Sequence, residues 1–390
     1  MNRILFHSLT IPPDQVSTGK LVAEIASKFK EKNINIEILA SMPQYRFDSS
    51  DFTNEGFKKV SGNVFVSTYK GVKITHLSSS KRSFSRVKRF SQWISYHLKS
   101  ILYLTKNRKN FDTIYIFSYP PTMNLIAIYS KKILKKKTIY SIWELYPEIA
   151  QKLNELNSNL LLGLFKKVDN FCLKVIDSVV VNSEQLKEYL IRKRNIDDKK
   201  ISVIYHFANE IETPKSEKLT KEIMYAGNVG TPQNLESFIN IFSSSKKDYK
   251  LTIYGSGSQF DKISDYQSEN LIVNSFIHRD ELIKQTKDIP FALVSLSPKI
   301  TIEGFPGKTF DYLKMNKILI GYSNPESSLA NFIEQHNVGI NISPNEKNLD
   351  SKLEIFEDAK VVQQIYQNIT YVNNKFANID IVSQQYIELA

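Results

Sequence analysis

Short apolar runs alternate with longer segments along the first half of the chain. The runs have the length of buried strands, and apolar residues in the longer segments recur every three or four positions, which is typical of amphipathic helices. This pattern predicts strands at residues 3–8, 34–39, 113–117, 138–142, 178–181 and 201–205, and helices at 20–30, 123–134, 160–174 and 184–192. Strands that alternate with helices through short links form a parallel sheet covered on both faces.

The same alternation begins again after residues 207–221, a polar segment that contains Pro214 and has no periodicity. The second half predicts strands at 223–226, 251–254, 271–273, 291–296, 318–321 and 339–342, and helices at 234–242, 280–287, 308–314 and 328–336. We therefore expect an α/β protein with one domain at 1–207, a second at 208–378 and a terminal helix at 379–390. Ligands of open parallel sheets bind beyond the carboxyl ends of the strands, so a cleft between the two sheets is the expected site.

The composition is that of an ordinary globular protein of two domains. Of the 390 residues, 42% are hydrophobic and 24% are charged, which excludes a disordered chain. The single cysteine, Cys172, cannot form an internal disulfide, and the six histidines are scattered, so we expect no metal site. The first residues lack the apolar run of a signal peptide, and the longest uncharged apolar segment, 113–130, is interrupted by Pro120 and Pro121. We therefore expect a cytoplasmic protein without a membrane-spanning segment.

Positive charge is concentrated in the first half of the chain. Residues 1–195 contain 32 lysines and arginines against 15 acidic residues, whereas residues 196–390 contain 20 against 25. No acidic residue occurs between Glu55 and Asp112, and this stretch contains 13 basic residues. A stretch of one sign over this length indicates an anionic partner.

An amphipathic segment lies within this basic stretch. Its apolar and aromatic residues recur at steps of three and four positions: Phe90, Trp93, Ile94, His97, Leu98, Ile101 and Leu102. A basic helix with aromatic residues suits an anionic membrane surface, and the candidate membrane contacts are Arg82, Arg86, Lys88, Arg89 and Trp93. The alternative is an apolar stripe packed on its own domain beneath a solvated basic face. No nucleic-acid-binding motif accompanies the charge, so we expect no nucleic acid partner.

The most informative motif is the segment Glu-Gly-Phe-Pro-Gly-Lys-Thr-Phe-Asp at residues 303–311, which joins a polar loop to a predicted helix. Gly304 and Gly307 allow the backbone to approach a ligand closely. The N–H groups around Lys308 and Thr309 lie at the start of the helix, where anions bind, and Lys308 adds a full positive charge. The motif therefore predicts an anion site, and its alternative is a glycine turn before a capped helix.

Carboxylates stand at both ends of this motif. Asp311, one turn into the helix, could accept two hydrogen bonds from a ribose diol, and Glu303, before the turn, could hold sugar hydroxyls. Glycine-bearing turns also follow two other predicted strands of the second domain, at residues 227–230 and 255–257. Each turn by itself is a common tight turn, but three of them at strand ends favour a site for a nucleoside diphosphate.

These motifs resemble the GT-B glycosyltransferases, which have two Rossmann-like domains facing each other across a cleft. The resemblance is to glycosyltransferase family 4, and within it to the bacterial branch that builds O-antigen, capsule and other exopolysaccharides. The family's Glu-x7-Glu element is similar to Glu303 and Asp311, with Asp in place of the second Glu. Four more segments are similar to elements of the branch: Pro306-Gly-Lys-Thr-Phe-Asp-Tyr312, Ser118-Tyr-Pro-Pro121, Glu144-Leu-Tyr-Pro-Glu148 and Thr18-Gly-Lys20.

The resemblance implies a retaining transfer of a sugar from a nucleotide diphosphate sugar, UDP-linked more often than GDP-linked, to a lipid-linked or saccharide acceptor. It implies that Asp311 binds the ribose, Glu303 the donor sugar hydroxyls and Lys308 the diphosphate. Further implied donor contacts are Gly19, Gly227, Asn228, Gly255, Gly304, Phe305, Pro306, Gly307 and Thr309. Glu144 and Glu148 would line the acceptor side, and with Glu303 and Lys308 they are the candidate catalytic residues. No cofactor is implied, because the nucleotide sugar is a substrate.

The chain departs from the family pattern at three places. The Arg and Lys that follow the first strand of the second domain are missing, and Asn228 stands at the Arg-like position, so that Lys20 or Arg279 would assist Lys308. The first loop keeps one of its usual glycines, and Glu144 replaces an Asp. The missing pair favours one alternative, an inert partner subunit of the same fold, and a nucleotide-sugar epimerase is another.

The family also implies a location and a place for the last helix. A transferase that acts on lipid-linked acceptors would lie at the inner face of the cell membrane as a peripheral protein. In the family the terminal helix crosses back to the first domain, so the helix at 379–390 is expected to pack there.

Overall fold

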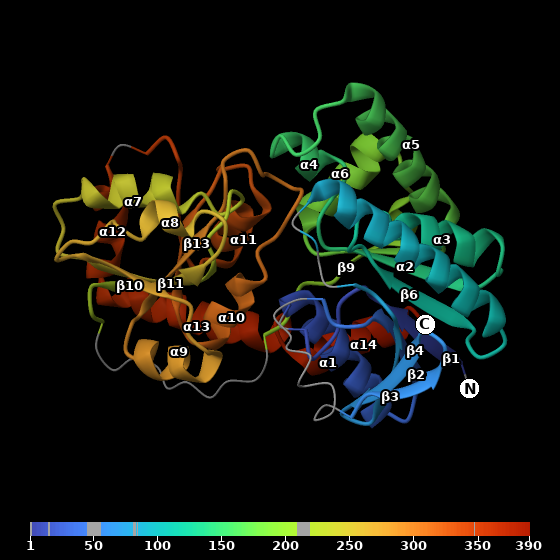
Figure 1. Cartoon of the computed structure of the whole chain (residues 1–390). Coiled ribbons are helices and arrows are strands. Elements are labelled where there is room, and N and C mark those ends of the chain that lie inside the picture. Colours follow the sequence, from blue (N-terminus) through green and yellow to red (C-terminus); the bar gives the residue numbers. More distant parts are fainter. Residues whose placement is uncertain are drawn as a thin grey trace. The chain divides into compact units, whose positions relative to one another are not determined.

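The computed structural model describes residues 2–14, 16–44, 56–80, 83, 85–208, 219–346 and 348–390. The chain forms two compact units, seen in Figure 1. The first unit consists of Met1–Pro147, Asn157–Tyr205 and Ile379–Ala390, and the second of Glu148–Leu156 and His206–Asn378. The sequence analysis placed residues 148–156 in the first domain, and this was wrong, because the segment packs with the second unit. Most of the expected linker, residues 209–218, lies outside the described residues.

The first unit is built on a nine-stranded sheet with the strand order β3-β4-β5-β2-β1-β6-β7-β8-β9. All pairs from β5 to β9 are parallel. The strands are β1 (Arg3–His7), β2 (Asn35–Ser41), β3 (Lys58–Ser61), β4 (Val64–Tyr69), β5 (Val72–Leu77), β6 (Thr113–Phe117), β7 (Lys137–Ile142), β8 (Ser178–Val181) and β9 (Ile201–Val203). The strands expected from the apolar runs of this half are therefore present.

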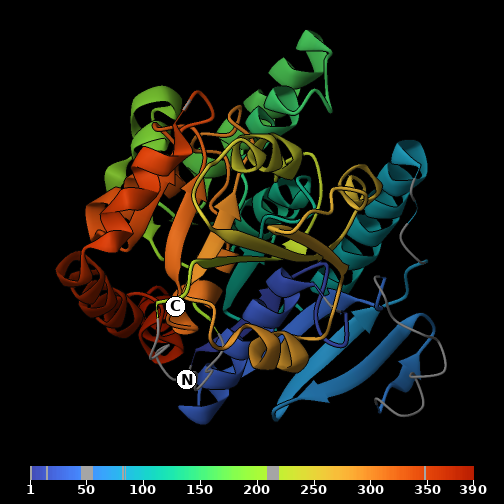
Figure 2. The same cartoon turned by 90° about the vertical axis from the view of Figure 1, so that its left-hand side faces the viewer.

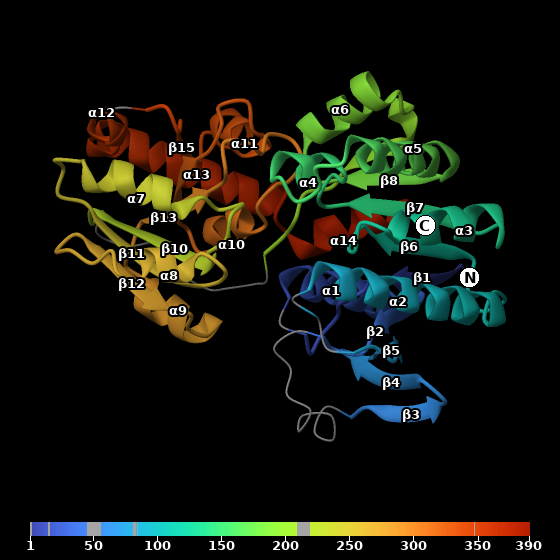
Figure 3. The ribbon, with the colours of Figure 1, turned by 45° about the horizontal axis from the view of Figure 1, so that its top comes forward.

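Strands β3 and β4 at one edge of this sheet are antiparallel, as Figure 3 shows at the lower right. The sequence analysis expected a wholly parallel sheet and no strand in this region. Every residue of β3 is exposed, and β4 is mostly half-buried. These strands therefore lack the continuous apolar runs that identify strands buried on both faces.

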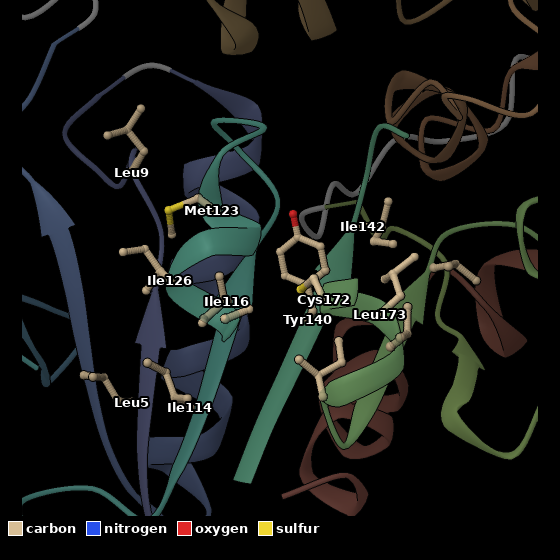
Figure 4. Close-up of a cluster of buried hydrophobic side chains, with 14 of the residues drawn as sticks. Leu5, Leu9, Ile114, Ile116, Met123, Ile126, Tyr140, Ile142, Cys172 and Leu173 are labelled. Atoms are coloured by element: carbon tan, nitrogen blue, oxygen red, sulfur yellow. The ribbon is translucent and has the colours of Figure 1, made fainter. Parts of the chain in front are cut away.

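One face of the first sheet is covered by α2 (Arg86–Lys106), α3 (Met123–Lys132) and α5 (Asn159–Val175). Side chains from these helices and from alternate positions of the strands form one hydrophobic cluster, part of which is drawn in Figure 4. In this cluster Met123, Tyr140 and Cys172 are buried, and Cys172 lies beside Tyr140. Cys172 is thus a small core residue.

The opposite face carries an aromatic cluster between the sheet, α1 (Ser17–Glu31) and α14 (Ile379–Glu388). The Phe6 ring lies 5.2 Å from that of Phe29 and 4.9 Å from that of Tyr115, centre to centre. Tyr115 donates a hydrogen bond to the Tyr386 carbonyl, and the Tyr386 hydroxyl lies 3.0 Å from Ser141 Oγ. The terminal helix thus fills a place on the first sheet. Another helix of this unit, α6 (Glu184–Arg194), packs on β8 and β9.

The second unit has a six-stranded parallel sheet with the order β12-β11-β10-β13-β14-β15. The strands are β10 (Glu222–Asn228), β11 (Lys250–Ser256), β12 (Leu271–Ser275), β13 (Phe291–Ser295), β14 (Ile318–Tyr322) and β15 (Gly339–Ile342). The helices, seen from this unit's side in Figure 2, are α4 (Glu148–Lys152), α7 (Leu235–Ser243), α8 (Phe260–Ile263), α9 (Arg279–Thr286), α10 (Lys308–Lys314), α11 (Ser328–His336), α12 (Leu349–Leu353) and α13 (Ala359–Lys375).

The strand order reverses beside β10. The chain runs from β10 to β11 and β12 on one side, then returns to place β13 on the other side of β10. Ligands of open α/β sheets bind beyond the carboxyl ends of the strands at such a reversal. The ends of β10 and β13 are therefore the place in this unit to look for a site.

Candidate active site

Two side chains of α10 fix the start of this helix to the carboxyl end of β10. The Tyr312 hydroxyl accepts a hydrogen bond from the Ala226 N–H (2.7 Å) and donates one to the Ala226 carbonyl (3.0 Å). Lys308 Nζ donates to the same carbonyl at 3.2 Å. Because residues four apart lie on one face of a helix, both side chains reach Ala226. The motif found in the sequence thus lies beside the strand-order reversal.

The Lys308 ammonium group lies over an aromatic ring. Its Nζ is 3.8 Å from the centre of the Tyr225 ring, and desolvation there lowers the pKa of Lys308 to about 7, although the charge of Asp311 opposes the shift. The sequence analysis counted a full positive charge here. Desolvation instead disfavours the charged form of this lysine until an anion arrives.

The space for this ammonium group depends on Gly227. This residue has a φ of +134°, and a Cβ at its position would lie 3.0 Å from Lys308 Nζ. A φ in this range favours glycine, and any side chain would also push the ammonium group away. Gly227 therefore holds the site open for Lys308.

Asp311 is held by an arginine from α9. Its Oδ1 accepts a hydrogen bond from Arg279 Nη2 at 3.0 Å, and both side chains are partly exposed, at 36% and 37%. A carboxylate has about four lone-pair sites, so Asp311 can still accept hydrogen bonds from a ligand. The arginine fixes the orientation of the carboxylate and supplies positive charge near Lys308.

Glu303 is buried, and both of its carboxylate oxygens have partners. Lys152 Nζ lies 2.8 Å from Oε1, and the Thr301 N–H donates to Oε2 at 2.9 Å. Lys152 also donates to Thr301 Oγ1 at 2.7 Å. The Glu303 side chain is 3% exposed and that of Lys152 is 35% exposed. The carboxylate expected to face a sugar is therefore already part of an ion pair.

The loop between the two carboxylates is partly open and partly core. A Cβ at Gly304 or at Gly307 would meet a single atom each, at 3.8 and 3.9 Å, so neither glycine is required by the packing of the protein. The Phe305 ring, in contrast, is buried 5.5 Å from the ring of Phe310. The expectation that Phe305 binds the donor was wrong for its side chain, because that side chain lies in the core.

The end of this loop has less free backbone than expected. The Thr309 N–H donates to the Pro306 carbonyl at 3.1 Å, so it is engaged in the turn that starts α10. The Thr309 side chain is fully buried, and its hydroxyl has no hydrogen-bond partner among the described residues. Pro306 is half-buried. An anion at this turn would therefore depend more on Lys308 than on the Thr309 amide.

The two other glycine turns of this unit pack against each other. A Cβ at Gly255 would lie 2.6 Å from Val229 Cγ2 and 2.8 Å from the Gly227 carbonyl oxygen. The Val229 N–H donates to the Ser256 carbonyl at 2.9 Å. Gly255 therefore has a packing role that explains the glycine without a ligand. Asn228 is exposed, and its Nδ2 donates to Gln233 Oε1 at 2.9 Å.

The residues expected on the acceptor side fall in different units. Glu144 is exposed and lines a small cavity of the first unit together with Ser118 and Asp169. Glu148 is buried at the start of α4, in the second unit. Gly19 lies in α1, where a Cβ would be only 2.8 Å from the Thr10 carbonyl oxygen. Gly19 is therefore explained by close backbone packing.

Comparisons with known proteins identify the fold and the class. Residues 19–210 match the family model described as Glycosyltransferase Family 4. The sucrose-phosphate synthase of Thermosynechococcus elongatus is similar in structure, with a TM-score of 0.73 at 11% identity, over 100% of this chain and 98% of that one. The chain is a GT-B glycosyltransferase. The fold predicted from the sequence is thus confirmed.

Two further solved structures resemble this glycosyltransferase along its whole length. HepE of Anabaena, in complex with UDP and glucose, has a TM-score of 0.68 at 11% identity, with 100% and 99% of the two chains covered. The lipopolysaccharide outer core galactosyltransferase WaaB has a TM-score of 0.62 at 14% identity, with 100% and 99% covered. At these identities the likeness establishes the fold. No curated protein matches the sequence of this enzyme.

Sequence reasoning missed two residues that contact members of the candidate site. Tyr225 precedes the expected glycine turn and carries no signal of its own, since it reads as the end of a buried strand. Lys152 is far from Glu303 along the chain, and no local pattern connects the two. The ion pair depends on α4 packing with the second unit.

The expected membrane helix of the enzyme is apolar on two sides. Trp93 packs against the hydrophobic cluster of the first unit, and the Arg89 guanidinium lies 5.9 Å from its ring centre. The Trp93 ring is half-buried against the core and offers less surface to a membrane than expected, so its membrane contact stays a prediction. Val87, Phe90, Ile94, Leu98 and Leu102 form an exposed apolar stripe along α2 instead.

The basic residues expected at this surface are described only in part. Lys88 is exposed, the side chain of Arg86 is not described, and Arg82 lies outside the described residues. In the part of the chain that is described, no helix of the glycosyltransferase is long and apolar enough to cross a membrane. The same residues contain no group of three or more His, Cys, Asp or Glu that could hold a metal ion.

Proposed function

We propose that this glycosyltransferase transfers a hexose, with retention of configuration, from a nucleotide diphosphate sugar to a lipid-linked or saccharide acceptor in bacterial surface polysaccharide synthesis. UDP is the proposed nucleotide, in preference to GDP. The observation that carries the proposal is the placement of Lys308 and Asp311 at the carboxyl end of β10, beside the strand-order reversal. The UDP and glucose in the HepE structure and the lipopolysaccharide substrate class in the name of WaaB support it.

The donor nucleotide is assigned to the α10 motif. The Asp311 carboxylate accepts hydrogen bonds from the ribose diol, with Arg279 holding it in place. Lys308 binds the diphosphate and is protonated fully when that anion arrives. The half-buried backbone at Gly307, where an added Cβ would meet one atom at 3.9 Å, permits the close approach of the diphosphate, whereas Gly304 is buried.

The reaction needs stabilisation of the departing diphosphate. The bond between the anomeric carbon and the phosphate oxygen breaks while the acceptor oxygen approaches the same face of the sugar. The acceptor proton passes to the departing phosphate oxygen, so the products are the glycosylated acceptor and the nucleoside diphosphate. Negative charge develops on the diphosphate, and Lys308 in its desolvated place opposes that charge.

The remaining carboxylates are assigned to the two sugars. Glu303 accepts hydrogen bonds from donor sugar hydroxyls, and Glu144 and Glu148 hold the acceptor. Replacing Glu148 with Gln tests this last role: turnover is expected to fall, and unchanged turnover would remove Glu148 from the site. The change keeps the volume of the side chain, so it tests the charge rather than the packing.

A panel of nucleotide sugars, each with and without lipid-linked acceptor, tests the proposed reaction. We expect nucleotide release that depends on acceptor, with the anomeric configuration of the donor kept in the product. Product formed without acceptor would indicate an epimerase, and absence of both binding and turnover across the panel would indicate an inert partner subunit. Either result would overturn the proposal.

We propose further that α2 rests on the anionic inner face of the cell membrane. The exposed side chains of Phe90, Leu98 and Leu102 would enter the lipid interface, and exposed basic residues of the same helix, among them Lys88 and Lys106, would contact lipid headgroups. Exposed apolar side chains also follow α5, at Leu160, Leu161, Leu164 and Phe171, and α3 lies between the two helices and packs against both.

Sedimentation with lipid vesicles tests this surface. The wild type is expected to bind vesicles that contain phosphatidylglycerol, to bind pure phosphatidylcholine weakly, and to be released by salt. The double variant Leu98→Ser/Leu102→Ser should lose most of this binding. Ile355→Ser is the matched control, because Ile355 is an exposed apolar residue of the second unit. Equal binding by all three proteins would exclude α2 as the membrane surface.

A further inference from the structure

The ion pair between Lys152 and Glu303 joins two segments that are distant in the sequence. Lys152 is the last residue of α4, and Glu303 begins the loop that leads into α10. Lys152 Nζ lies 2.8 Å from Glu303 Oε1 and donates to Thr301 Oγ1 at 2.7 Å. The Thr301 N–H donates to the other carboxylate oxygen at 2.9 Å. The Thr301 hydroxyl also donates to this second oxygen, at 3.4 Å, so three groups fix the position of one carboxylate.

This carboxylate is buried against a cation. The Glu303 side chain is 3% exposed, and burial of an unpaired carboxylate favours its protonated form. Lys152 is the cation that the structure places against it. A protonated Glu303 would lose much of its capacity as a hydrogen-bond acceptor, because one oxygen becomes a donor.

The ion pair leaves part of the carboxylate for a ligand. An ionised carboxyl group has about four lone-pair sites. Lys152 occupies one on Oε1, and the Thr301 N–H and hydroxyl occupy the two on Oε2, so one site on Oε1 remains. Helix α4 also approaches the neighbouring Gly304, where Ile149 Cδ1 lies 3.8 Å from the position of a Cβ. The α4 segment thus borders the loop at the same point where the carboxylate is fixed.

We propose that Lys152 is a positioning residue of the donor sugar site. It holds the Glu303 carboxylate so that the remaining lone pair of Oε1 accepts a hydrogen bond from a donor sugar hydroxyl. This inference rests on the role proposed above for Glu303. Lys152 itself does not touch the reacting atoms, and its effect on donor binding passes through Glu303.

The test compares the variants Lys152→Met, Lys152→Arg and Glu303→Gln with wild type in the full chain. Lys152→Met is expected to raise the KM for the nucleotide sugar at least tenfold, whereas the affinity for the free nucleoside diphosphate, which has no sugar, changes less than twofold. Lys152→Arg is expected to recover the KM to within about threefold of wild type, because arginine restores the charge. The double variant Lys152→Met/Glu303→Gln should be no worse than Glu303→Gln alone.

A pH profile separates positioning from a merely structural effect. Without its counter-charge, Glu303 should protonate at higher pH, so Lys152→Met is expected to gain an acidic limb in kcat/KM that wild type lacks. Lys187→Met is the control, since Lys187 forms a 2.8 Å ion pair with Asp198 in the first unit. It should behave as wild type in KM and in pH profile.

The outcomes distinguish this inference from the proposed function. If wild type is active and Lys152→Met keeps its KM and pH profile, the role of Lys152 is overturned and the function stands. If Lys152→Met loses nucleotide and nucleotide-sugar binding equally, or only its melting temperature falls, Lys152 is a structural residue. If wild type binds and converts no nucleotide sugar, both the proposed function and the sugar-facing role of Glu303 fail.

Discussion

Lys308 and Tyr225 form a cation–π contact at the carboxyl end of β10, with 3.8 Å between the ammonium nitrogen and the ring centre. The ring takes the place of water around the ammonium group, and this desolvation lowers the pKa of Lys308 to about 7. A diphosphate that binds here would raise that pKa again, because an opposite charge favours the protonated form. Binding of the nucleotide is therefore coupled to uptake of a proton by Lys308.

We predict that this coupling makes nucleotide affinity dependent on pH. Above pH 7 the free enzyme loses the Lys308 proton and binding must restore it, so the affinity for UDP should fall about tenfold between pH 7 and pH 8.5. This range lies above the last ionisation of a terminal phosphate, at about pH 6. Titration calorimetry in buffers of different ionisation enthalpy should show proton uptake on binding.

Variants of Lys308 provide the controls for this prediction. Lys308→Arg should bind UDP with little change over the same range, because a guanidinium group stays protonated. Lys308→Met should bind weakly at every pH. A wild-type affinity that is flat from pH 7 to 8.5 would show that Lys308 does not contact the diphosphate.

Asp311 gives a second prediction for nucleotide binding. Asp311→Ala should weaken UDP binding by about 1.5–3 kcal/mol, the range for loss of hydrogen bonds to a charged group. Asp261→Ala is the control, since Asp261 is an exposed acidic residue of α8 in the same unit and should leave the affinity unchanged. If Asp311→Ala binds UDP and GDP as tightly as wild type does, the ribose lies elsewhere.

The glycines of the second unit should respond to alanine in opposite ways. Gly307 has helical geometry, and an added Cβ would lie 3.9 Å from His206 Cδ2, so Gly307→Ala should change the free energy of unfolding by less than about 0.5 kcal/mol. It should still weaken UDP binding, because the methyl group covers backbone that the diphosphate approaches. Unchanged UDP affinity would exclude this backbone from the site.

Gly255→Ala is the complementary change. Its Cβ would overlap the Val229 side chain and the Gly227 backbone, so the variant should lose about 1–3 kcal/mol of stability, as overpacked sites do. Thermal unfolding of both variants, together with UDP titration, separates the ligand role of one glycine from the packing role of the other. A stable Gly255→Ala protein would contradict the packing explanation.

The helices and strands that have a clear apolar pattern of their own could be predicted from the sequence. The helix expected at 308–314 is confirmed as α10, and the strand expected at 113–117 is confirmed as β6. In both segments the apolar period changes at a loop, which fixes the ends. The antiparallel strands β3 and β4 have no such signal, since they lie at an exposed edge of the sheet.

The face of a helix that packs inward could not be predicted from period alone. On α2, apolar residues occur on both sides, so that Trp93 and Leu104 turn toward the hydrophobic cluster while Leu98 and Leu102 are exposed. Similarly, the motif at 303–311 indicated a site, but not that Lys152 would fill one side of Glu303. Contacts between distant segments depend on packing, which a single sequence does not contain.

Lys317 is a buried lysine with a structural role. Its Nζ donates to the carbonyls of Thr286 and Ile289 at 2.6 Å each, and to that of Lys287 at 3.1 Å, so it caps the end of α9. Burial lowers the pKa of Lys317 to about 8, whereas an unfolded lysine titrates near 10.4. Between these two pKa values the unfolded chain binds more protons than the folded one. The free-energy cost of burying the charged Lys317 is therefore greatest below pH 8, and it decreases as the pH rises above 8.

We predict that Lys317→Met destabilises the protein by about 2–4 kcal/mol, because buried carbonyls at the end of α9 lose their donor. The stability difference between wild type and this variant should grow from pH 8 to pH 10, since only the wild type gains from release of the Lys317 proton. Denaturant unfolding at each pH measures both effects. Lys262→Met, at an exposed lysine of α8, is the control and should change stability by less than about 0.5 kcal/mol. A Lys317→Met protein as stable as wild type would show that apolar packing replaces the three hydrogen bonds.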